Sequence, residues 1–298
     1  MESEHVSGFV TIIGRPNVGK STLMNQIIGE KISIISDKIQ TTRHTIHGIL
    51  SEEDAQIIFI DTPGIHKPKH RLGDYMVDVS IQTLNDVDVI LFMINAKEGY
   101  GKGDEFILEQ LSHVDSPVFL LINKVDLIHP DELFPLIEQY KDKCDFEEII
   151  PISALNGNNV NTAISYIKSH LPAGPKYYDE NQITNKSERF LLSELIREKV
   201  LTHTKEEVPH SINVMIESME ERNKQTVYIQ ALIITERKSQ KGILIGKNGK
   251  MLKKIGQEAR VEMEEVLGKK VFLDLWVKIQ KDWRNRQSLL TQYGFNND

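Results

Sequence analysis

GRPNVGKS, at residues 14–21, decides the fold of the first half of this chain because it matches the phosphate-binding loop pattern G-x-x-x-x-G-K-[ST]. Gly14 and Gly19 permit a tight turn whose consecutive N–H groups can point at a phosphate. We expect Lys20 to reach the β- and γ-phosphates and the Ser21 hydroxyl to bind Mg²⁺. The predicted phosphate-binding residues are Gly14, Arg15, Pro16, Asn17, Val18, Gly19, Lys20, Ser21 and Thr22.

Two later segments, NKVD at 123–126 and SAL at 153–155, predict that the base is guanine. The Asp126 carboxylate can accept hydrogen bonds from N1–H and the 2-amino group of guanine. Adenine has neither donor, and a site built this way discriminates by about 10⁴ or more. We expect the Ala154 N–H to donate to guanine O6 and the Lys124 stem to cover the ring. The predicted guanine-binding residues are Asn123, Lys124, Asp126, Ser153 and Ala154.

DTPG, at 61–64, is suited to sensing the γ-phosphate. Asp61 ends an apolar run and is expected to contact Mg²⁺ through water. Gly64 has no side chain to prevent its N–H from approaching the γ-phosphate. Because hydrolysis would remove that contact, the segment that follows is a natural switch. The predicted residues here are Asp61, Thr62, Pro63 and Gly64.

The first 170 residues alternate short apolar runs with helical patterns, which predicts an α/β domain with a mostly parallel sheet. The four chemical segments each follow a predicted strand, at the edge where open α/β sheets bind ligands. Residues 30–45 have no periodicity and are expected to form a loop of functional length. The predicted strands are 8–13, 46–50, 55–60, 87–94, 118–122 and 148–152.

Composition is that of a globular protein, with 40% hydrophobic and 27% charged residues and a single cysteine, Cys144. No apolar run approaches the roughly eighteen residues of a membrane span, and the start has no signal-peptide pattern. A cytoplasmic protein is therefore expected. The net charge of −7 is divided unevenly. Residues 1–187 carry 16 basic and 27 acidic residues, whereas residues 188–298 carry 20 and 16, so the second half is suited to a polyanion.

Residues 171–189 are rich in Pro, Gly and polar residues, and after them the pattern changes to α-β-β-α-α-β with a terminal helix. The first two strands of this part are predicted at 211–216 and 226–234, and the terminal helix from about Asp282. Within this α+β part, a Gly-x-x-Gly loop precedes an amphipathic helix. Seven basic residues and no acidic one lie between Arg237 and Lys254. This resembles a type II KH domain, which implies binding of single-stranded RNA. The predicted RNA-binding residues are Gly246, Lys247, Asn248, Gly249 and Lys250. The alternative is a solvated basic loop.

The first half resembles the translation-factor-related GTPases. That resemblance places the first switch at QTTRH, 40–44, with Thr42 as the Mg²⁺ ligand and Thr41 as the competing assignment. The metal set is then Ser21, Thr42 and, through water, Asp61. Some relatives hold K⁺ near the phosphates with an asparagine at the position of Asn17, so Asn17 is a possible K⁺ ligand. The alternative is that Asn17 only shapes the turn.

Two residues beside the switches bear on the expected rate of GTP hydrolysis. Ile65 follows the switch glycine where Ras-like enzymes have glutamine, so slow intrinsic hydrolysis is expected. Arg43 is either an internal arginine finger or, in the favoured interpretation, an exposed salt-bridging residue.

GRPNVGKS, QTTRH, DTPGIH, NKVD and SALNG, together with IGKNGK and DLWVK at 274–278, resemble the bacterial Era GTPases over nearly the whole chain. The resemblance implies an Era-type G domain at 1–172, a linker at 173–187 and a type II KH domain with a C-terminal helix at 188–298. It also implies binding of the 3′ region of 16S rRNA, a function in 30S subunit assembly, and peripheral association with the inner membrane. We expect a monomer that binds GTP and GDP, and a site in which ppGpp would share the guanine and β-phosphate contacts.

Three alternatives stay open at this point. A tRNA-modifying GTPase would need a reactive cysteine near its C-terminus, and Cys144 is in the other half. A second alternative is an RNA-binding scaffold whose nucleotide site is largely structural. The third is a membrane-recruited regulator, because Trp283, Leu289, Leu290 and Phe295 of the last helix could face lipid or pack on the KH core.

Overall fold

The computed structural model describes residues 5–65 and 67–296. Contacts within the chain separate it into two units. Unit 1 comprises Met1–Ser33, Ile39–Lys69 and Gly73–Asn185, and unit 2 comprises Ile34–Lys38, His70–Leu72 and Lys186–Asp298. The domain boundaries at 172 and 188 stay predictions.

The sheet of unit 1 has six strands in the order β2-β3-β1-β4-β5-β6. Only the β2–β3 pair is antiparallel, and every other pair is parallel. All residues of β3, β4 and β5 are buried, as expected for strands covered on both faces. The predicted α/β class is confirmed. The strands are β1 (Val6–Gly14), β2 (Ile46–Ser51), β3 (Ala55–Asp61), β4 (Val89–Asn95), β5 (Val118–Asn123) and β6 (Phe146–Pro151).

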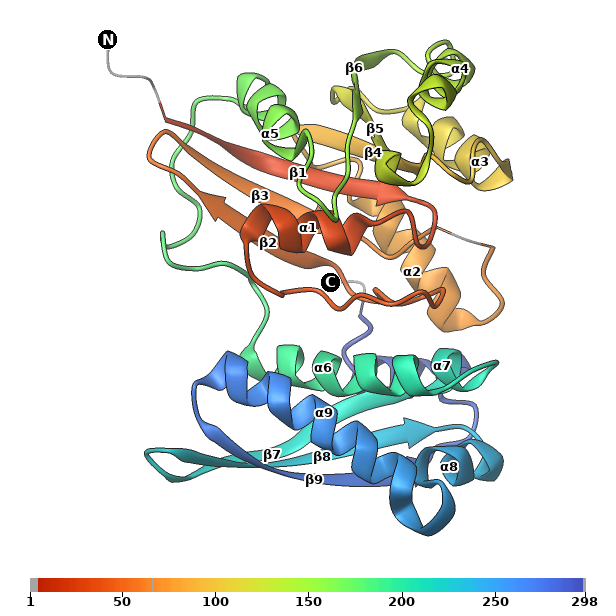
Figure 1. Cartoon of the computed structure of the whole chain (residues 1–298), viewed down its shortest axis with the longest axis vertical. Helices are drawn as coiled ribbons and strands as arrows, with labels where there is room; N and C mark the ends of the chain where they lie inside the picture. The colour runs from red at the N-terminus through yellow and green to blue at the C-terminus, as the bar shows by residue number, and fades with distance from the viewer. Residues whose placement is uncertain (1–4, 66, 297–298) are drawn as a thin grey trace. The chain divides into compact units, whose positions relative to one another are not determined.

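Helices lie on both faces of this sheet (Figure 1). α1 and α5 lie in front of it in the view of Figure 1, and α2 passes behind it. One continuous core joins alternate residues of β4 and β5, such as Phe92 and Leu120, to Ile107 of α3 and Leu136 of α4. The helices of the first half are α1 (Lys20–Ile28), α2 (Arg71–Gln82), α3 (Lys102–Leu111), α4 (Pro130–Tyr140) and α5 (Val160–Ser169), with a 3₁₀ turn, η1, at Val125–Leu127.

The carboxyl ends of the parallel strands gather the chemical segments. GRPNVGKS follows β1, DTPG begins at the last residue of β3, NKVD begins at the last residue of β5, and SAL follows β6. These strands are neighbours or near neighbours in the sheet, so segments that are up to 140 residues apart in sequence meet at one edge. Residues 29–45 contain no helix or strand, which confirms the predicted loop.

The stretch that precedes unit 2 is hydrogen-bonded to the sheet of unit 1. Ala173 and Thr184 form isolated bridges to Val6 and Gly48, respectively. The buried Gln56 side chain accepts the N–H groups of residues 177 and 178 and donates to the carbonyl oxygen of residue 178. Residues 173–184 are therefore held against β1, β2 and β3.

Unit 2 contains a three-stranded sheet in the order β7-β8-β9, with β7 and β8 antiparallel and β8 and β9 parallel. The element order predicted for an α+β KH-like domain is confirmed. The elements are α6 (Glu188–His203), α7 (Val208–Ser211), β7 (Asn213–Asn223), β8 (Thr226–Thr235), α8 (Lys238–Ile245), η2 (Lys247–Gly249), α9 (Lys250–Leu267), β9 (Lys270–Ile279), η3 (Trp283–Asn285) and α10 (Gln287–Gln292).

Three boundaries in unit 2 differ from the sequence prediction. The strand expected at 211–216 begins at Asn213, because Ser211 ends the short helix α7. The same strand continues to Asn223 although its second half is polar, because residues such as Glu220 pair in register with β8 at the edge of the sheet. The last helix, expected from about Asp282, begins as the 3₁₀ turn η3 and becomes α10 at Gln287.

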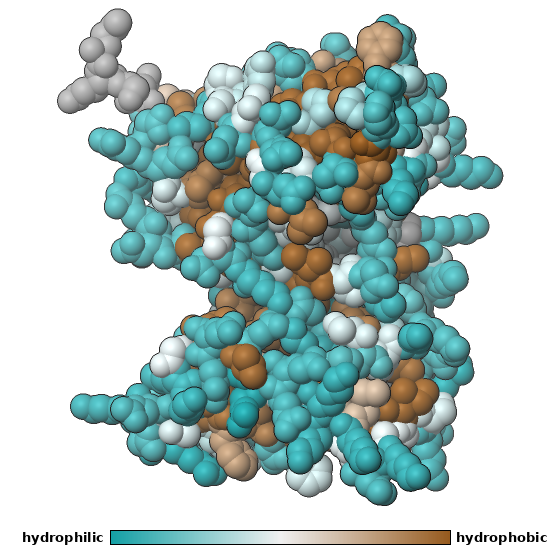
Figure 2. Space-filling model, viewed as in Figure 1, coloured by the Kyte–Doolittle hydropathy of each residue, from teal (hydrophilic) through white to brown (hydrophobic). Residues whose placement is uncertain are grey.

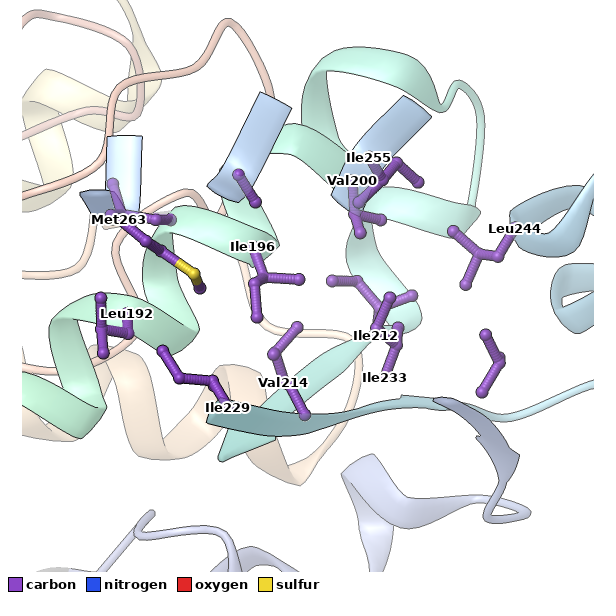
Figure 3. Packing of buried hydrophobic residues seen from close by; sticks show 14 of the residues in the cluster. Leu192, Ile196, Val200, Ile212, Val214, Ile229, Ile233, Leu244, Ile255 and Met263 are labelled. Atoms are coloured by element: carbon purple, nitrogen blue, oxygen red, sulfur yellow. The ribbon is translucent and has the colours of Figure 1, made fainter. Parts of the chain in front are cut away.

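The core of unit 2 lies between its helices and one face of its sheet (Figure 3). Leu192, Ile196 and Val200 of α6 pack with Ile255 and Met263 of α9 over the strands. The opposite face of α9 carries charged side chains, and Figure 2 shows a mostly hydrophilic surface over this helix. This two-sided pattern explains why helical periodicity was readable in the sequence.

Candidate functional site

The phosphate loop has a backbone conformation that requires glycine at residue 19. Gly19 has φ of 110°, and a Cβ added there would lie 2.2 Å from Asn123 Nδ2. A Cβ at Gly14 would lie 2.3 Å from the Met93 carbonyl oxygen. Asn17, at the exposed tip of the loop, also has a positive φ, of 62°. Both glycines of the motif are therefore needed for close backbone approach.

Lys20, the first residue of α1, is buried at the base of this loop. Its Nζ donates to the carbonyl oxygens of Gly14, at 3.2 Å, and Arg15, at 3.1 Å. Burial lowers the pKa of Lys20 to about 8, and the nearby Asp61 carboxylate opposes this shift. The ammonium group is thus enclosed by the loop that the sequence assigns to phosphate, and an anion there would favour its charged form.

Three oxygen-bearing side chains that the sequence predicted as a Mg²⁺ set lie together. Ser21 Oγ donates to Asp61 Oδ2 at 2.8 Å and lies 3.0 Å from Thr42 Oγ1. Thr42 Oγ1 is 3.4 Å from the same carboxylate oxygen, and Ser33 Oγ, which the sequence did not predict, donates to it at 3.0 Å. Thr41, the competing assignment, is buried beside Thr42.

The cluster fits a hard divalent cation. Asp61 is fully buried, and burial raises the pKa of its carboxyl although Lys20 and three hydroxyl groups oppose the shift. Its Oδ1 atom has no hydrogen-bond partner among the described residues. Carboxylate and hydroxyl oxygens with water and phosphate are the ligands that Mg²⁺ prefers. In the described ranges, no group of three His, Cys, Asp or Glu side chains could hold a metal by itself.

The second switch begins against the phosphate loop. Thr62 Oγ1 donates to the Ile12 carbonyl oxygen at 2.8 Å, and Ser80 Oγ donates to that of Pro63 at 2.9 Å. A Cβ at Gly64 would lie 2.8 Å from Pro16 Cα, so only glycine lets these two backbones approach. The geometry places Gly64 beside the loop that the sequence assigned to phosphate.

Ile65 packs into the core of unit 1. Its side chain is buried in the cluster formed by β4, β5, α3 and α4, and its N–H donates to the Gly14 carbonyl oxygen at 3.3 Å. We therefore expect Ile65→Gln to leave the rate of GTP hydrolysis unchanged and to lower the free energy of unfolding by about 1–3 kcal/mol, because an amide would be buried without a partner. Single-turnover hydrolysis and urea unfolding measure the two effects. Ile65→Leu, which conserves volume, is the control, and a faster Ile65→Gln enzyme would contradict the assignment.

Asn123 joins the phosphate loop to the base-recognition loop. Its Nδ2 donates to the Val18 carbonyl oxygen at 2.7 Å, and its Oδ1 accepts the Ala154 N–H at 2.9 Å. Lys124 has φ of 65°, and its Nζ donates to the Asn17 carbonyl oxygen at 2.7 Å. The hydrogen bond of Ala154 to guanine O6 stays a prediction, since this N–H meets Asn123 in the structure.

Asp126 lies in η1 with an exposed side chain, where a base could reach it. The adjacent Val125 N–H donates to the Ile152 carbonyl oxygen at 3.3 Å, which ties NKVD to the start of SAL. Ser153 is fully buried and its Oγ accepts the Asn156 N–H at 3.3 Å, which shapes this loop, and its contact with guanine stays a prediction. The two guanine segments are thus brought to one place.

The side chains of two arginines, Arg15 and Arg43, lie in positions that the sequence did not predict. Arg15 turns its guanidinium away from the loop, donating to buried Asp104 at 3.0 Å and to the Gly99 carbonyl oxygen at 2.8 Å. Tyr140 OH donates to the same carboxylate at 3.2 Å. Only the backbone of Arg15 therefore belongs to the phosphate loop. Arg43 is 2% exposed, so the interpretation that it is an exposed salt-bridging residue was wrong.

The second candidate site surrounds the Gly-x-x-Gly loop between α8 and α9. Gly246, Asn248 and Gly249 have φ of 70°, 54° and 74°, and a Cβ at Gly246 would lie 2.7 Å from Met251 Cβ. Lys247 and Lys250 are exposed at this turn. The loop thus presents bare backbone and two cations at the start of a long helix.

A groove of about 430 Å³ runs from this loop between α9 and β9. Gly249, Lys253, Gly256 and Arg260 line it on the helix side, with Phe272 among the residues on the strand side. Lys253 and Arg260 were missed as site residues. They lie four and eleven residues after Gly249, close to one and three helical turns, which could have indicated that they share its helix face. The groove is basic on its helix wall and apolar on its strand wall.

Comparisons with known proteins agree with both sites. Residues 9–124 match a family model described as a 50S ribosome-binding GTPase, and residues 207–284 match a KH domain model.

Two similar solved structures cover almost the whole chain. One is Era in complex with MgGDPNP and nucleotides 1506–1542 of 16S ribosomal RNA, with 43% identity, a TM-score of 0.94, and coverage of 98% of this chain and 99% of that one. The other is a single-residue variant of Aquifex aeolicus Era bound to GDP·AlF₄⁻, with 43% identity, a TM-score of 0.93, and coverage of 97% and 99%.

Proposed function

The chain belongs to the Era family of GTPases, which combine a GTP-hydrolysing domain with a C-terminal KH domain, and we propose that its nucleotide state controls binding to the 3′ region of 16S rRNA during 30S subunit assembly. The observation that supports this most directly is the basic groove beside the glycine loop, present in one chain with a complete set of nucleotide-binding segments. The similar Era complex with 16S rRNA nucleotides 1506–1542 supports the choice of RNA.

In the nucleotide site, the proposed ligands of Mg²⁺ are Ser21, Thr42 and, through water, Asp61. The ion would neutralise charge on the β- and γ-phosphates. Lys20 would donate to those phosphates after leaving the loop carbonyls that it now contacts. Gly64 would present its N–H to the γ-phosphate, so that loss of this phosphate releases the second switch. Alarmones such as ppGpp would share the guanine and β-phosphate contacts.

Substitution of the two adjacent threonines distinguishes the proposed metal ligand. Thr42→Ala is expected to raise the Mg²⁺ concentration needed for GTP binding about 10- to 150-fold, the range for loss of one hydrogen bond to a charged group, and to raise that needed for GDP binding much less. Thr41→Ala is the matched control, because Thr41 is the adjacent threonine, is about equally buried and is the competing assignment. Titration of Mg²⁺ against a fluorescent GTP analogue measures the effect. An equal shift in both variants would remove the assignment to Thr42.

The RNA function is tested by two neighbouring lysines of α9. Lys253 lines the groove, whereas Lys254 lies outside it and approaches Glu258 on the same helix. Lys253→Ala is expected to reduce the slope of log affinity against log salt by about 0.7 for a single-stranded contact, and Lys254→Ala to leave it unchanged. Anisotropy of a labelled RNA spanning nucleotides 1506–1542, with GDPNP and with GDP, gives both the slope and the nucleotide dependence.

Each outcome of that experiment decides something. No preference for this RNA over an unrelated RNA of the same length would overturn the proposal. Preference for it without any effect of nucleotide would favour the scaffold with a structural nucleotide site.

The proposal is for a monomeric protein and contains no membrane step. Trp283, Leu290 and Phe295, which suggested a lipid-facing helix, are 0–2% exposed and pack within unit 2. No helix in the described ranges has the length and apolar character required to cross a bilayer.

A further inference from the structure

The outward face of β9 carries an unusual row of side chains. Successive residues of a strand point to opposite faces, and the residues facing the core include the buried Val271 and Val277. The other set faces away from the helices. Phe272 and Trp276 in this set are 56% and 57% exposed. The outward row reads Lys270, Phe272, Asp274, Trp276 and Lys278.

The aromatic rings of this row are held in fixed positions. Tyr228, opposite Phe272 in the β8–β9 register, stacks on it with ring centroids 5.6 Å apart and an interplanar angle of 27°. The Arg222 guanidinium lies 4.5 Å from the Tyr228 ring and 5.5 Å from that of Phe272. Asp274 Oδ2 accepts both Trp276 Nε1–H, at 3.0 Å, and Tyr228 O–H, at 3.3 Å. The single acidic group of the row therefore orients the rings.

The exposed rings and lysines of this face suit a ligand that carries both flat aromatic groups and negative charges. Exposed, preoriented rings bind unstacked bases, and stacking is tolerant of sequence because every base has a π face. Lys270 and Lys278 are exposed at the two ends of the row, where a phosphate backbone would meet them. A purely apolar partner would not need these cations.

The face is continuous with the groove described above. Phe272 also lines that groove, opposite Lys253 and Arg260. β9 is the edge strand of its sheet, so no other strand separates the groove from the outward face.

We propose that single-stranded RNA held in the groove continues across β9 and stacks bases on Phe272 and Trp276. This inference rests on the proposed RNA function and extends its site beyond the glycine loop and α9. The site would then hold a longer segment than the groove alone.

Trp276 is the discriminating residue because it lies outside the groove. Affinity is measured with the full-length protein for the RNA spanning nucleotides 1506–1542 and for hexanucleotides tiled across it. Trp276→Ala is expected to weaken binding of the longer RNA about 5- to 150-fold, the range for loss of one base stack. It should leave the affinity for the tightest-binding hexanucleotide unchanged. Trp276→Phe should restore most of the affinity because it keeps a ring. Val266→Ala, an exposed apolar residue of α9 outside the groove, is the control.

Fluorescence gives a readout that a loss of folding would not imitate. The chain has two tryptophans, and Trp283 is fully buried. The longer RNA should quench the exposed Trp276 of the wild-type protein, and the hexanucleotide should not.

The outcomes separate this inference from the proposed function. If wild-type protein binds neither RNA, the proposed function fails. If it binds the longer RNA while Trp276→Ala has no effect and no quenching occurs, the stacking surface is overturned and the groove is retained. If Trp276→Ala weakens association with small ribosomal subunits but not with the RNA, the face binds protein and the inference is equally overturned.

Discussion

Replacing Asp126 by asparagine is expected to transfer nucleotide preference from GTP to XTP. The carboxylate lies exposed in η1, and NKVD is tied to SAL through the Val125 N–H. In guanine the two donors of the base would lose a charged acceptor, which costs about 2–5 kcal/mol, or roughly 30- to 5,000-fold in affinity. In xanthine the 2-oxo group would instead accept from the asparagine amide. Competition of GTP and XTP against a fluorescent GDP analogue measures the exchange.

The control for this experiment is Asp131→Asn. Asp131 is an exposed acid in the first turn of α4, five residues further along the chain, and its removal changes the net charge by the same amount. It should leave the preference for GTP intact. Retained GTP preference in the Asp126 variant would mean that this carboxylate does not contact the base.

Asn123→Ala is expected to lower the catalytic efficiency of GTP hydrolysis about 100-fold and the free energy of unfolding by about 2–4 kcal/mol. The variant leaves the Val18 carbonyl oxygen and the Ala154 N–H without their present partner inside the protein. The loops that hold the phosphates and the base would then no longer be fixed to one another, and small misplacements of this kind cost about 10²-fold in rate. Asn123→Asp should behave similarly, because a carboxylate cannot donate to the Val18 carbonyl.

Asn95 offers a matched control at the end of the neighbouring strand. It pairs in register with Asn123, is buried, and makes two local hydrogen bonds, to Glu98 Oε1 and from the Lys97 N–H. Asn95→Ala should destabilise the protein without the 100-fold kinetic effect. Equal kinetic losses in the two variants, measured by steady-state GTP hydrolysis and urea unfolding, would show that Asn123 acts through stability alone.

Much of the nucleotide site could be predicted because its chemistry is local in sequence. A position with φ of 110°, such as that of Gly19, requires glycine, so it can be recognised from a short sequence motif. Buried strands leave continuous apolar runs, so all six strands of the first sheet could be located to within about two residues. The edge at which the motifs meet then follows from the parallel topology.

Several site residues could not be predicted from such patterns. Ser33 sits in a loop without periodicity, and nothing near it in sequence indicates that it would reach the Asp61 carboxylate. Arg15 belongs to the phosphate loop by spacing, yet its side chain is paired with Asp104, 89 residues away. Lys253 is one of several lysines on α9, and only the packing of α9 against β9 separates it from Lys254.

The sequence by itself determined the fold class of both halves, the guanine pocket and the glycine loop, because turn geometry and hydrophobic periodicity depend on residues close together in the chain. Only the tertiary structure decided that Ile65 faces the core, that Asn123 joins two loops, and that Phe272 and Trp276 share an exposed face. The reason is physical. The partner of a side chain is set by which elements pack together, and that packing minimises the free energy of the whole chain rather than of any one segment.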